Sequence, residues 1–264
     1  MKYKLTKNTK QWGDTTLYQI EALKDFGDIK KGDLGGYIEK EDNLTQEWNA
    51  WVSDDVQVFD NARVSDDAKV SGNAKVSGDA RVFGNAWVSN NAQVFGNAQV
   101  FDNTRVFGDA KVFGNAKVFR NAWAYDNAQV ANYAKVYDNA RVFGNAQVYE
   151  HAQVYEHAQV SGNAWVYEHA WVYGAAKVFG AARVSGDARV SGDAKACGVC
   201  ITLGNAIKHF VTITDNHIRI GCEQKTFDEW ETWLSSDGEF ETKRSDPYFK
   251  KITLTIEYIL AMQQ

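Results

Sequence analysis

The sequence has one proline, three cysteines, and no run of 18 or more apolar residues in its 264 residues. Three cysteines do not make a disulfide framework, so they favour a reducing compartment. Without a long apolar run we expect no membrane-spanning helix, and the opening MKYKLTKNTK lacks the apolar stretch of a signal peptide. We therefore expect a cytoplasmic protein that does not enter a membrane.

A large excess of charge of one sign is also absent. There are 29 Lys and Arg against 34 Asp and Glu, which gives a formal net charge of -5. That balance argues against a protein that works by coating itself with nucleic acid. How the charges are distributed along the chain carries more information than their sum.

A six-residue repeat dominates the chain instead. It runs without interruption from Val52 to Lys195 as 24 hexads of the form V, x, G or D, N or D, A, x. The first position is valine in 23 hexads and alanine at Ala124, and the fifth is alanine in 22, with Val56 and Thr104 as the exceptions. Apolar positions two residues apart predict strands and not helices, so we expect short strands, with the first and fifth positions inward, joined by two-residue turns.

In segments such as AKVSGNAKVSGDARV this pattern resembles the left-handed hexapeptide-repeat β-helix family. The resemblance implies a triangular prism with three hexads, or 18 residues, in each coil. Leu34, Ile38, Leu44 and Ala50 continue the register in front of the regular hexads. We therefore expect an all-β solenoid, a left-handed parallel β-helix of about nine coils that spans residues 34–195.

A solenoid needs caps at both ends because its terminal coils would otherwise expose strand edges and core. We expect a small β cap in residues 1–33 and an α+β cap in residues 196–264. In the second, HFVTITDNHIRIG predicts a hairpin turning near Asp215 and Asn216, Thr226 and Glu229 predict a capping box, and Pro247 predicts the first turn of a second helix. The LGGYI and TDNHIRIGCE segments resemble uncharacterised β-helical proteins of phage and prophage genomes.

Residues 18 apart should stack in columns on three outer faces. We name each face by its sixth-position column, which is flanked by the second-position residues of the same strands. The first face carries Trp51, Lys69, Trp87, Arg105, Trp123, Arg141, Gln159, Lys177 and Lys195. The second carries Gln57, Lys75, Gln93, Lys111, Gln129, Gln147, Trp165 and Arg183, and the third carries Arg63, Arg81, Gln99, Lys117, Lys135, Gln153, Trp171 and Arg189.

The faces and the turns differ in charge. The sixth positions hold 13 Lys or Arg, seven Gln, four Trp and no carboxylate, whereas the turn positions hold 15 Asp or Glu and a single cation, Arg120. The third face also has six consecutive second-position aromatics, from Phe83 to Tyr173. One interpretation is that stacked ladders only stabilise the rod and that one face, with the third as candidate, is buried in a homotrimer, the oligomer that the resemblance favours.

The other interpretation is a binding surface. Cations beside aromatic rings suit a planar, anionic, nucleotide-like molecule or a host protein, and no cofactor or metal is needed. We predict ligand contacts from Trp87, Arg105, Trp123, Arg141, Tyr137, Tyr155, Lys117 and Lys135. In a phage setting, such a protein would act without catalysis, by sequestering a host defence nucleotide or blocking a host protein.

Catalysis is the alternative, because hexapeptide β-helices often carry acyltransferases. Three Glu-His pairs, with His151, His157 and His169, offer a general base or paired metal ligands. Turn geometry is a simpler explanation, since histidine tolerates left-handed backbone better than most residues. The uninterrupted hexads also lack the loops that build an acyl-donor site in that family.

The cysteines allow a second alternative. Cys197 and Cys200 form a CxxC, and with His217 and Cys222 they make a Cys₃His zinc site conceivable. The spacing matches no standard zinc finger, and Cys200 falls on an inward small-residue position. We therefore predict that Cys200 belongs to the core and expect no metal site.

Overall fold

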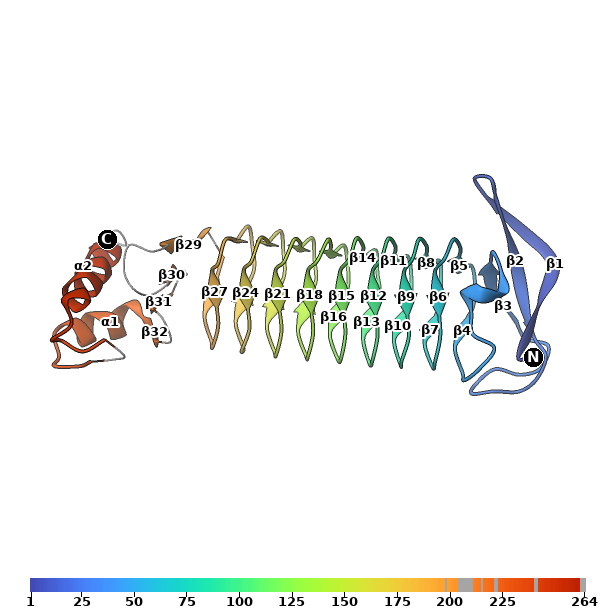
Figure 1. Ribbon diagram of the computed structural model, residues 1–264, viewed down its shortest axis with the longest axis horizontal. Helices are drawn as coiled ribbons and strands as arrows, with labels where there is room; N and C mark the ends of the chain where they lie inside the picture. The colour runs from blue at the N-terminus through green and yellow to red at the C-terminus, as the bar shows by residue number, and fades with distance from the viewer. Residues whose placement is uncertain (198, 204–210, 215, 221–222, 240–241, 262–264) are drawn as a thin grey trace.

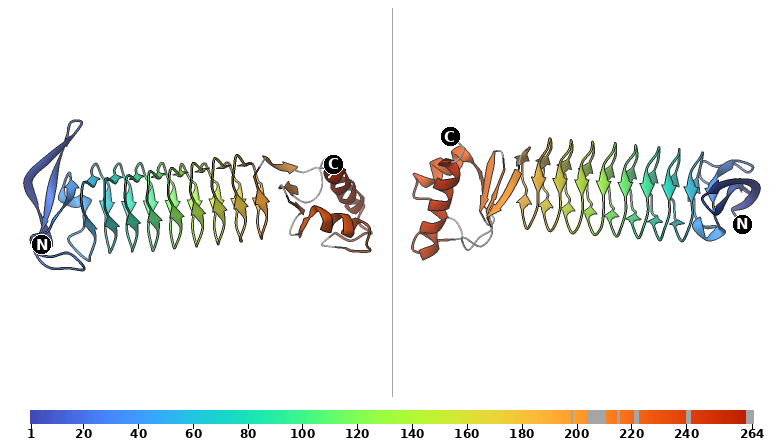
Figure 2. Two further views of the ribbon diagram at one scale, coloured as in Figure 1. Left: turned by 180° about the vertical axis from the view of Figure 1, so that it is seen from behind. Right: turned by 90° about the horizontal axis from the view of Figure 1, so that it is seen from above.

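The computed structural model describes residues 1–264 except 198, 204–210, 215, 221–222, 240–241 and 262–264. The chain is a straight rod with the N-terminal segment at one end and two helices at the other (Figures 1 and 2). Its middle is a parallel β-solenoid in which strands 18 residues apart pair side by side, and nine of them stack in one sheet. The predicted solenoid of about nine coils is confirmed.

Each hexad contributes one two-residue strand, made of its sixth position and the first position of the next hexad. The first face is a nine-stranded sheet of β4 (Trp51–Val52), β7 (Lys69–Val70), β10 (Trp87–Val88), β13 (Arg105–Val106), β16 (Trp123–Ala124), β19 (Arg141–Val142), β22 (Gln159–Val160), β25 (Lys177–Val178) and β28 (Lys195–Ala196). The third face is an eight-stranded sheet of β6 (Arg63–Val64), β9 (Arg81–Val82), β12 (Gln99–Val100), β15 (Lys117–Val118), β18 (Lys135–Val136), β21 (Gln153–Val154), β24 (Trp171–Val172) and β27 (Arg189–Val190).

The second face is continuous with both ends of the molecule, because its sheet has 15 strands that include those of the two caps. Its solenoid strands are β5 (Gln57–Val58), β8 (Lys75–Val76), β11 (Gln93–Val94), β14 (Lys111–Val112), β17 (Gln129–Val130), β20 (Gln147–Val148), β23 (Trp165–Val166) and β26 (Arg183–Val184). At the C-terminal end β29 (Val199–Leu203) pairs in parallel with β26 and places Cys200 opposite Val184.

The core is a narrow column of valine and alanine. Every first-position and fifth-position residue of the regular hexads has a relative exposure of 1% or less, including the exceptions Val56, Thr104 and Ala124. Thr104 is tolerated because its hydroxyl donates to the carbonyl of Phe101 at 2.7 Å, so no buried polar group is left unpaired. The inward positions predicted from the sequence are confirmed.

The turns depend on a left-handed residue at the third hexad position. Glycine adopts this conformation without strain, and at Gly78 a Cβ would lie 2.9 Å from the backbone nitrogen of Gly96 in the next coil. Asp, Asn, Glu and Arg also adopt positive φ at this position, as Asp102 does at 60° and Arg120 at 63°. Backbone strain of about 1 to 2 kcal/mol per non-glycine residue must therefore be offset locally.

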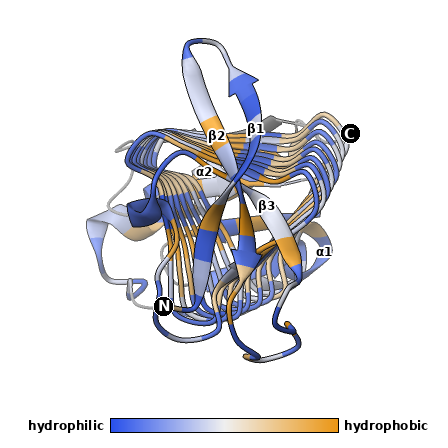
Figure 3. Ribbon diagram, turned by 90° about the vertical axis from the view of Figure 1, so that its right-hand side faces the viewer, coloured by the Kyte–Doolittle hydropathy of each residue, from blue (hydrophilic) through white to orange (hydrophobic). Residues whose placement is uncertain are grey.

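The N-terminal cap is a hairpin of β1 (Tyr3–Trp12) and β2 (Thr15–Ala22), followed by β3 (Leu34–Ile38), which pairs in parallel with β5, and by the short 3-10 helix η1 (Glu41–Asn43). The hairpin projects beyond the outline of the coils when the rod is viewed along its axis (Figure 3). Ile38, Leu44 and Ala50 are buried as predicted. Leu34 is not, because it lies at the start of β3 with 54% of its surface exposed.

Trp51 also differs from the prediction. It was expected to point outward at the base of the first-face column, but only 5% of it is exposed. The cap covers it, with the Phe26 ring 5.4 Å and the Tyr3 ring 6.5 Å away between centroids, both edge-on. The outer column of the first face therefore begins one coil later, at Lys69.

The C-terminal cap is a small antiparallel sheet with two helices. Strands β30 (Val211–Ile213) and β31 (His217–Ile220) form the predicted hairpin, and β32 (Glu223–Thr226) pairs with β31. Helix α1 (Phe227–Leu234) begins with the predicted capping box of Thr226 and Glu229, and α2 (Pro247–Ala261) begins at the predicted proline. No helix among the described residues is long and apolar enough to cross a membrane.

Candidate functional site

The fourth and sixth hexad positions both point outward on either side of a buried alanine. At the corner where the third face begins, side chains at these positions enclose a cavity of about 550 Å³. We call it the corner groove. It is lined by Asn115, Lys117, Tyr133, Lys135, His151, Gln153, His169, Trp171, Asp187 and Arg189.

One wall of the corner groove is a row of three rings. Tyr133 stacks on His151 with centroids 5.0 Å apart, and His151 stacks on His169 at 5.1 Å. The same column begins as an amide ladder, in which Asn97 Nδ2 donates to Asn115 Oδ1 at 3.2 Å. At Tyr133 the column changes from amides to rings. Tyr133 is 55% exposed, and among the described residues no ring stacks on its face toward Asn115.

The other wall is cationic. Lys117 and Lys135 lie on adjacent strands, and further along the Arg189 guanidinium lies 4.8 Å from the centroid of the Trp171 ring. None of these three cations takes part in an ion pair with a described residue. Asp187 is the one carboxylate in the lining, so the corner groove is cationic as a whole.

Behind the lysines runs the predicted third-face ladder. Its six rings stack in parallel with centroids 4.8 to 5.0 Å apart, and Tyr137 and Tyr155 are its fourth and fifth rings. Burial, and then the neighbouring tyrosines, raise the pKa of Tyr155 to about 12, so it stays a neutral hydroxyl at ordinary pH. The Tyr137 hydroxyl donates to Gln153 Oε1 at 3.3 Å, which ties the ladder to the groove wall.

The eight predicted contact residues fall into two groups. Trp87, Arg105, Trp123 and Arg141 lie on the first face, where Arg105 is 5.6 Å from the ring of Trp87 and 5.0 Å from that of Trp123. Lys117, Lys135, Tyr137 and Tyr155 lie on the third face. The structure does not bring the two groups together within one chain, so a single site can use only one of them.

The ladders are also less exposed than the sequence suggested, because each ring covers the next. Among the described aromatic residues of the outer faces, the large exposed ones are Trp87 at 47% and Phe179 at 38%. Sequence reasoning missed Tyr133, His169, Trp171 and Arg189 as neighbours of the two lysines. Reading the fourth-position column at 18-residue intervals would have found the three rings.

The turn explanation for the histidines is wrong. The left-handed residues are the glutamates before them, with φ of 58° at Glu150, 59° at Glu156 and 58° at Glu168. Their carboxylates accept the backbone N–H one coil further on, as Glu150 Oε2 does from Glu168 at 2.8 Å. In the described part of the chain, no hydrogen bond joins these carboxylates to the imidazoles.

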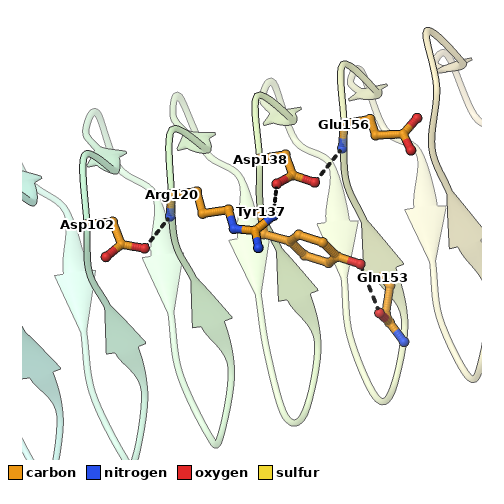
Figure 4. Close-up of polar contacts among 6 residues, drawn as sticks. All are labelled: Asp102, Arg120, Tyr137, Asp138, Gln153 and Glu156. Carbon is orange, nitrogen blue, oxygen red and sulfur yellow. Dashed lines mark hydrogen bonds and ion pairs between the residues drawn. The ribbon is translucent and has the colours of Figure 1, made fainter.

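The acidic turns have the same structural role throughout the rod. Figure 4 shows the edge beside the third face, where Asp102 accepts from the backbone N–H of Arg120 at 3.2 Å and Asp138 from that of Glu156 at 3.4 Å. The Arg120 side chain pairs with Asp138. These bonds satisfy edge backbone groups and offset the strain of the left-handed turn residues.

The predicted alternative of a zinc site falls partly outside the described residues. Cys222 is not among them, and neither is the side chain of Cys200, whereas Cys197 is exposed. Burial lowers the pKa of His217, which favours a neutral imidazole. Within the described residues, no group of three His, Cys, Asp or Glu side chains is placed to hold a metal ion.

Comparison with known proteins agrees with the repeat. A family model described as the YdcK beta solenoid repeat matches residues 74–90, 134–150, 158–174 and 182–198. Each matched segment begins at a fifth-position alanine, namely Ala74, Ala134, Ala158 and Ala182. A comparison with curated proteins gave no match. In these segments the chain is therefore similar to a known β-solenoid repeat.

Proposed function

We propose that this is a non-catalytic binding protein whose corner groove holds a planar, anionic, nucleotide-like ligand. The observation that carries the proposal is that three cations without carboxylate partners share one groove with a row of rings whose last member is open. Phosphate groups would contact Lys117 and Lys135, the two cations nearest Tyr133, as point charges.

The base of the ligand would stack on the open face of Tyr133, at the end of the ring row. A base stacked on Tyr133 over Asn115 would extend the row by one rung, beside Lys117 on the same coil as Asn115. Stacking of a base on an aromatic side chain contributes about 1 to 3 kcal/mol. The lysines would then fix the orientation through the phosphate.

Calorimetry with a panel of mono-, di- and cyclic nucleotides tests the proposal. We expect at least one to bind, and Tyr133→Asn to weaken it at least tenfold, because this change restores the amide ladder of the column without disturbing the coil. The double variant Lys117→Gln and Lys135→Gln should weaken nucleotide binding similarly, because it removes two cations from the groove. Glutamine is common at the sixth position, so the coils should tolerate both changes.

The matched control is Lys111→Gln with Lys177→Gln, which removes two charges from the same hexad position on the other two faces. It should bind like the parent. The proposal is wrong if no nucleotide gives heat, or if the control loses as much affinity as the groove variants, since the effect would then be one of net charge.

We further propose, from the family resemblance, a left-handed coil and a homotrimer about an axis parallel to the rod, with the third face buried. The corner groove would then open between subunits. Light scattering should give a mass three times that of the chain, and a monomer would rule the trimer out. Native mass spectrometry of the same sample would reveal a co-purified small molecule.

We favour binding over acyl transfer because the carboxylates of the Glu-His pairs hold backbone amides and not imidazoles. The proposed setting is the cytoplasm, that of the host cell if the protein is phage-encoded. There it would act by withholding a nucleotide signal from its receptor. Blocking of a host protein through the same groove is the competing outcome, and it predicts nucleotide-insensitive capture of that protein.

A further inference from the structure

A second, smaller cavity lies where the N-terminal cap meets the first face, far along the rod from the corner groove. Its volume is about 190 Å³, and its lining is formed mainly by Phe26, Ile29, Trp51, Val70 and Trp87. The loop between β2 and β3 supplies Phe26 and Ile29, so the cap builds one side and the solenoid the other. We call it the cap pocket.

Trp123, in the same column as Trp87, has a cation over each face of its ring, so we expect the same of Trp87. Two coils further on, Trp123 lies between Arg105 and Arg141, whose guanidinium carbons are 5.0 and 4.9 Å from its ring centroid. Trp165 and Trp171 likewise each carry an arginine, at 4.9 and 4.8 Å. Trp87 has Arg105 on one side, and on the other side the column places Lys69.

Lys69 does not cover the Trp87 ring, because the cap loop draws it away. Its ammonium pairs with Asp28 at 2.7 Å, and among the described residues it makes no cation-π contact. The Trp87 indole is instead oriented by its own Nε1, which donates to the Ser71 hydroxyl at 3.4 Å. The uncovered indole face is thus a wall of the cap pocket.

The chemistry of the pocket selects among possible occupants. Its aromatic and aliphatic walls favour a planar, apolar group, and Asn49, Ser53 and Ser71 add small polar groups to the lining. Lys69 and Asp28 both line the pocket as an ion pair, so the rim carries no net charge and favours an uncharged occupant. A volume near 190 Å³ suits one fused bicyclic ring.

We propose that the cap pocket is a binding site for an uncharged planar aromatic group that stacks on Trp87. This site is independent of the corner groove. The ring of the ligand takes the place that an arginine side chain takes on the other tryptophans of the solenoid.

Three probes that share one ring test it: indole, indole-3-acetate and tryptamine, with binding followed by ligand-observed NMR and by the Trp87 Nε1 resonance. Indole should bind with a dissociation constant on the order of 1 mM, typical of a small fragment. Indole-3-acetate and tryptamine should bind no more tightly than indole, because Lys69 and Asp28 already neutralise each other at the rim.

Trp87→Ala and Trp87→Leu should each reduce indole binding at least tenfold, and the leucine variant guards against collapse of the pocket. Trp123→Ala is the matched control, since it removes an indole from the same column whose two faces are already covered. Asp28→Ala should also weaken binding, because loss of the ion pair frees Lys69 to cover the Trp87 ring.

Equal binding of indole to the Trp87 variants and the parent would overturn the proposal, as would either charged probe binding at least tenfold more tightly than indole. Sedimentation covers one further outcome. If the parent self-associates and the Trp87 variants do not, while indole fails to compete, then a second copy of the chain fills the pocket and the ligand site is refuted.

Discussion

The two ends of the rod are closed in different ways. The N-terminal cap shares the core of the solenoid, because Tyr3, Ile20 and Ala22 belong to the same continuous cluster of buried residues as the valines and alanines up to Ala196. The C-terminal cap has a core of its own, built from β30, β31 and the two helices around Trp230. One end is therefore an extension of the rod, and the other is a small folding unit attached to it.

Side-chain size shows the same contrast. All of the largest fully buried side chains lie in the caps or in the irregular first coil, among them Trp230, Tyr3, Leu17 and Ile38. The regular coils bury only small residues, so each coil is stabilised mainly by contacts with its neighbours, as in other repeat proteins. Damage to the N-terminal cap should consequently spread into the rod, whereas damage to the C-terminal cap should stay local.

Trp230→Ala should have the largest effect. The ring is fully buried and its Nε1 donates to the carbonyl of Ile218 at 2.7 Å, so its loss should cost the C-terminal cap about 4 kcal/mol. Hydrogen exchange should become fast in residues 211–261 and stay slow in the solenoid strands. A single cooperative loss of protection along the whole chain would show that the caps do not differ as described.

Tyr3→Phe should have a smaller effect that travels further. The buried hydroxyl donates to the carbonyls of Leu44 at 2.7 Å and Glu41 at 3.0 Å, and removing it should cost about 2 kcal/mol. We expect the main urea transition to shift to lower concentration and exchange to rise in the first coils. Loss of hydrogen-exchange protection in residues 1–22 alone would show that the N-terminal cap is as separate a folding unit as the C-terminal cap.

Thr226→Ala tests the C-terminal unit more gently. It removes the side chain that accepts the backbone N–H of Glu229 at 3.2 Å, and loss of such a cap typically costs about 1 kcal/mol. The change should lower the stability of α1 and leave the midpoint of the main transition in place. Thr226→Ser keeps the acceptor and serves as the control.

A further prediction concerns pH. Burial, and then the nearby charge of Lys24, lower the pKa of Lys2 from 10.5 to about 8, although its ammonium donates to the carbonyls of Ala50 and Glu47 and lies over the ring of Phe26. Between pH 8 and 10 the unfolded chain binds more protons at this site, so stability should rise with pH.

Above pH 10, Tyr3 has the opposite effect on the free energy of unfolding. Its buried hydroxyl has a raised pKa, so the folded chain keeps a proton that the unfolded chain loses above pH 10, and stability should fall there. Urea midpoints at pH 7.5, 9, 10 and 11.5 measure both slopes. Lys2→Met should flatten the rise, and an unchanged rise in that variant would assign it to other groups.

The regular coils could be predicted from the sequence because every hexad repeats the same local rule, two inward residues and one turn. The exceptions arise where something outside the repeat acts on it. Trp51 occupies an outward position, but a cap without repeat periodicity covers it. The role of the turn glutamates was missed because it depends on which of the two turn residues has a left-handed backbone. The occurrence of Gly, Asp, Asn and Glu at the third position was the sequence signal that could have identified that residue.

The candidate sites were predictable only in part. Lys117 and Lys135 were identified from composition, but the ring row beside them becomes visible only when the chain is folded into 18-residue coils. The cap pocket could not be predicted, because it depends on a loop from the cap reaching Lys69 through Asp28.

The hexad register has a consequence for how this molecule can change in length. Removing or adding 18 residues from the regular part shortens or lengthens the rod by one coil and leaves every downstream residue on its original face. Removing six preserves the strands, the turns and the inward valines equally well, yet turns everything downstream by a third of a revolution. Such a deletion between Trp87 and Asn115 would move the corner groove to another side of the rod from the cap pocket. The six-residue unit therefore sets the angle between the two sites around the rod axis, and the 18-residue unit sets their separation along it.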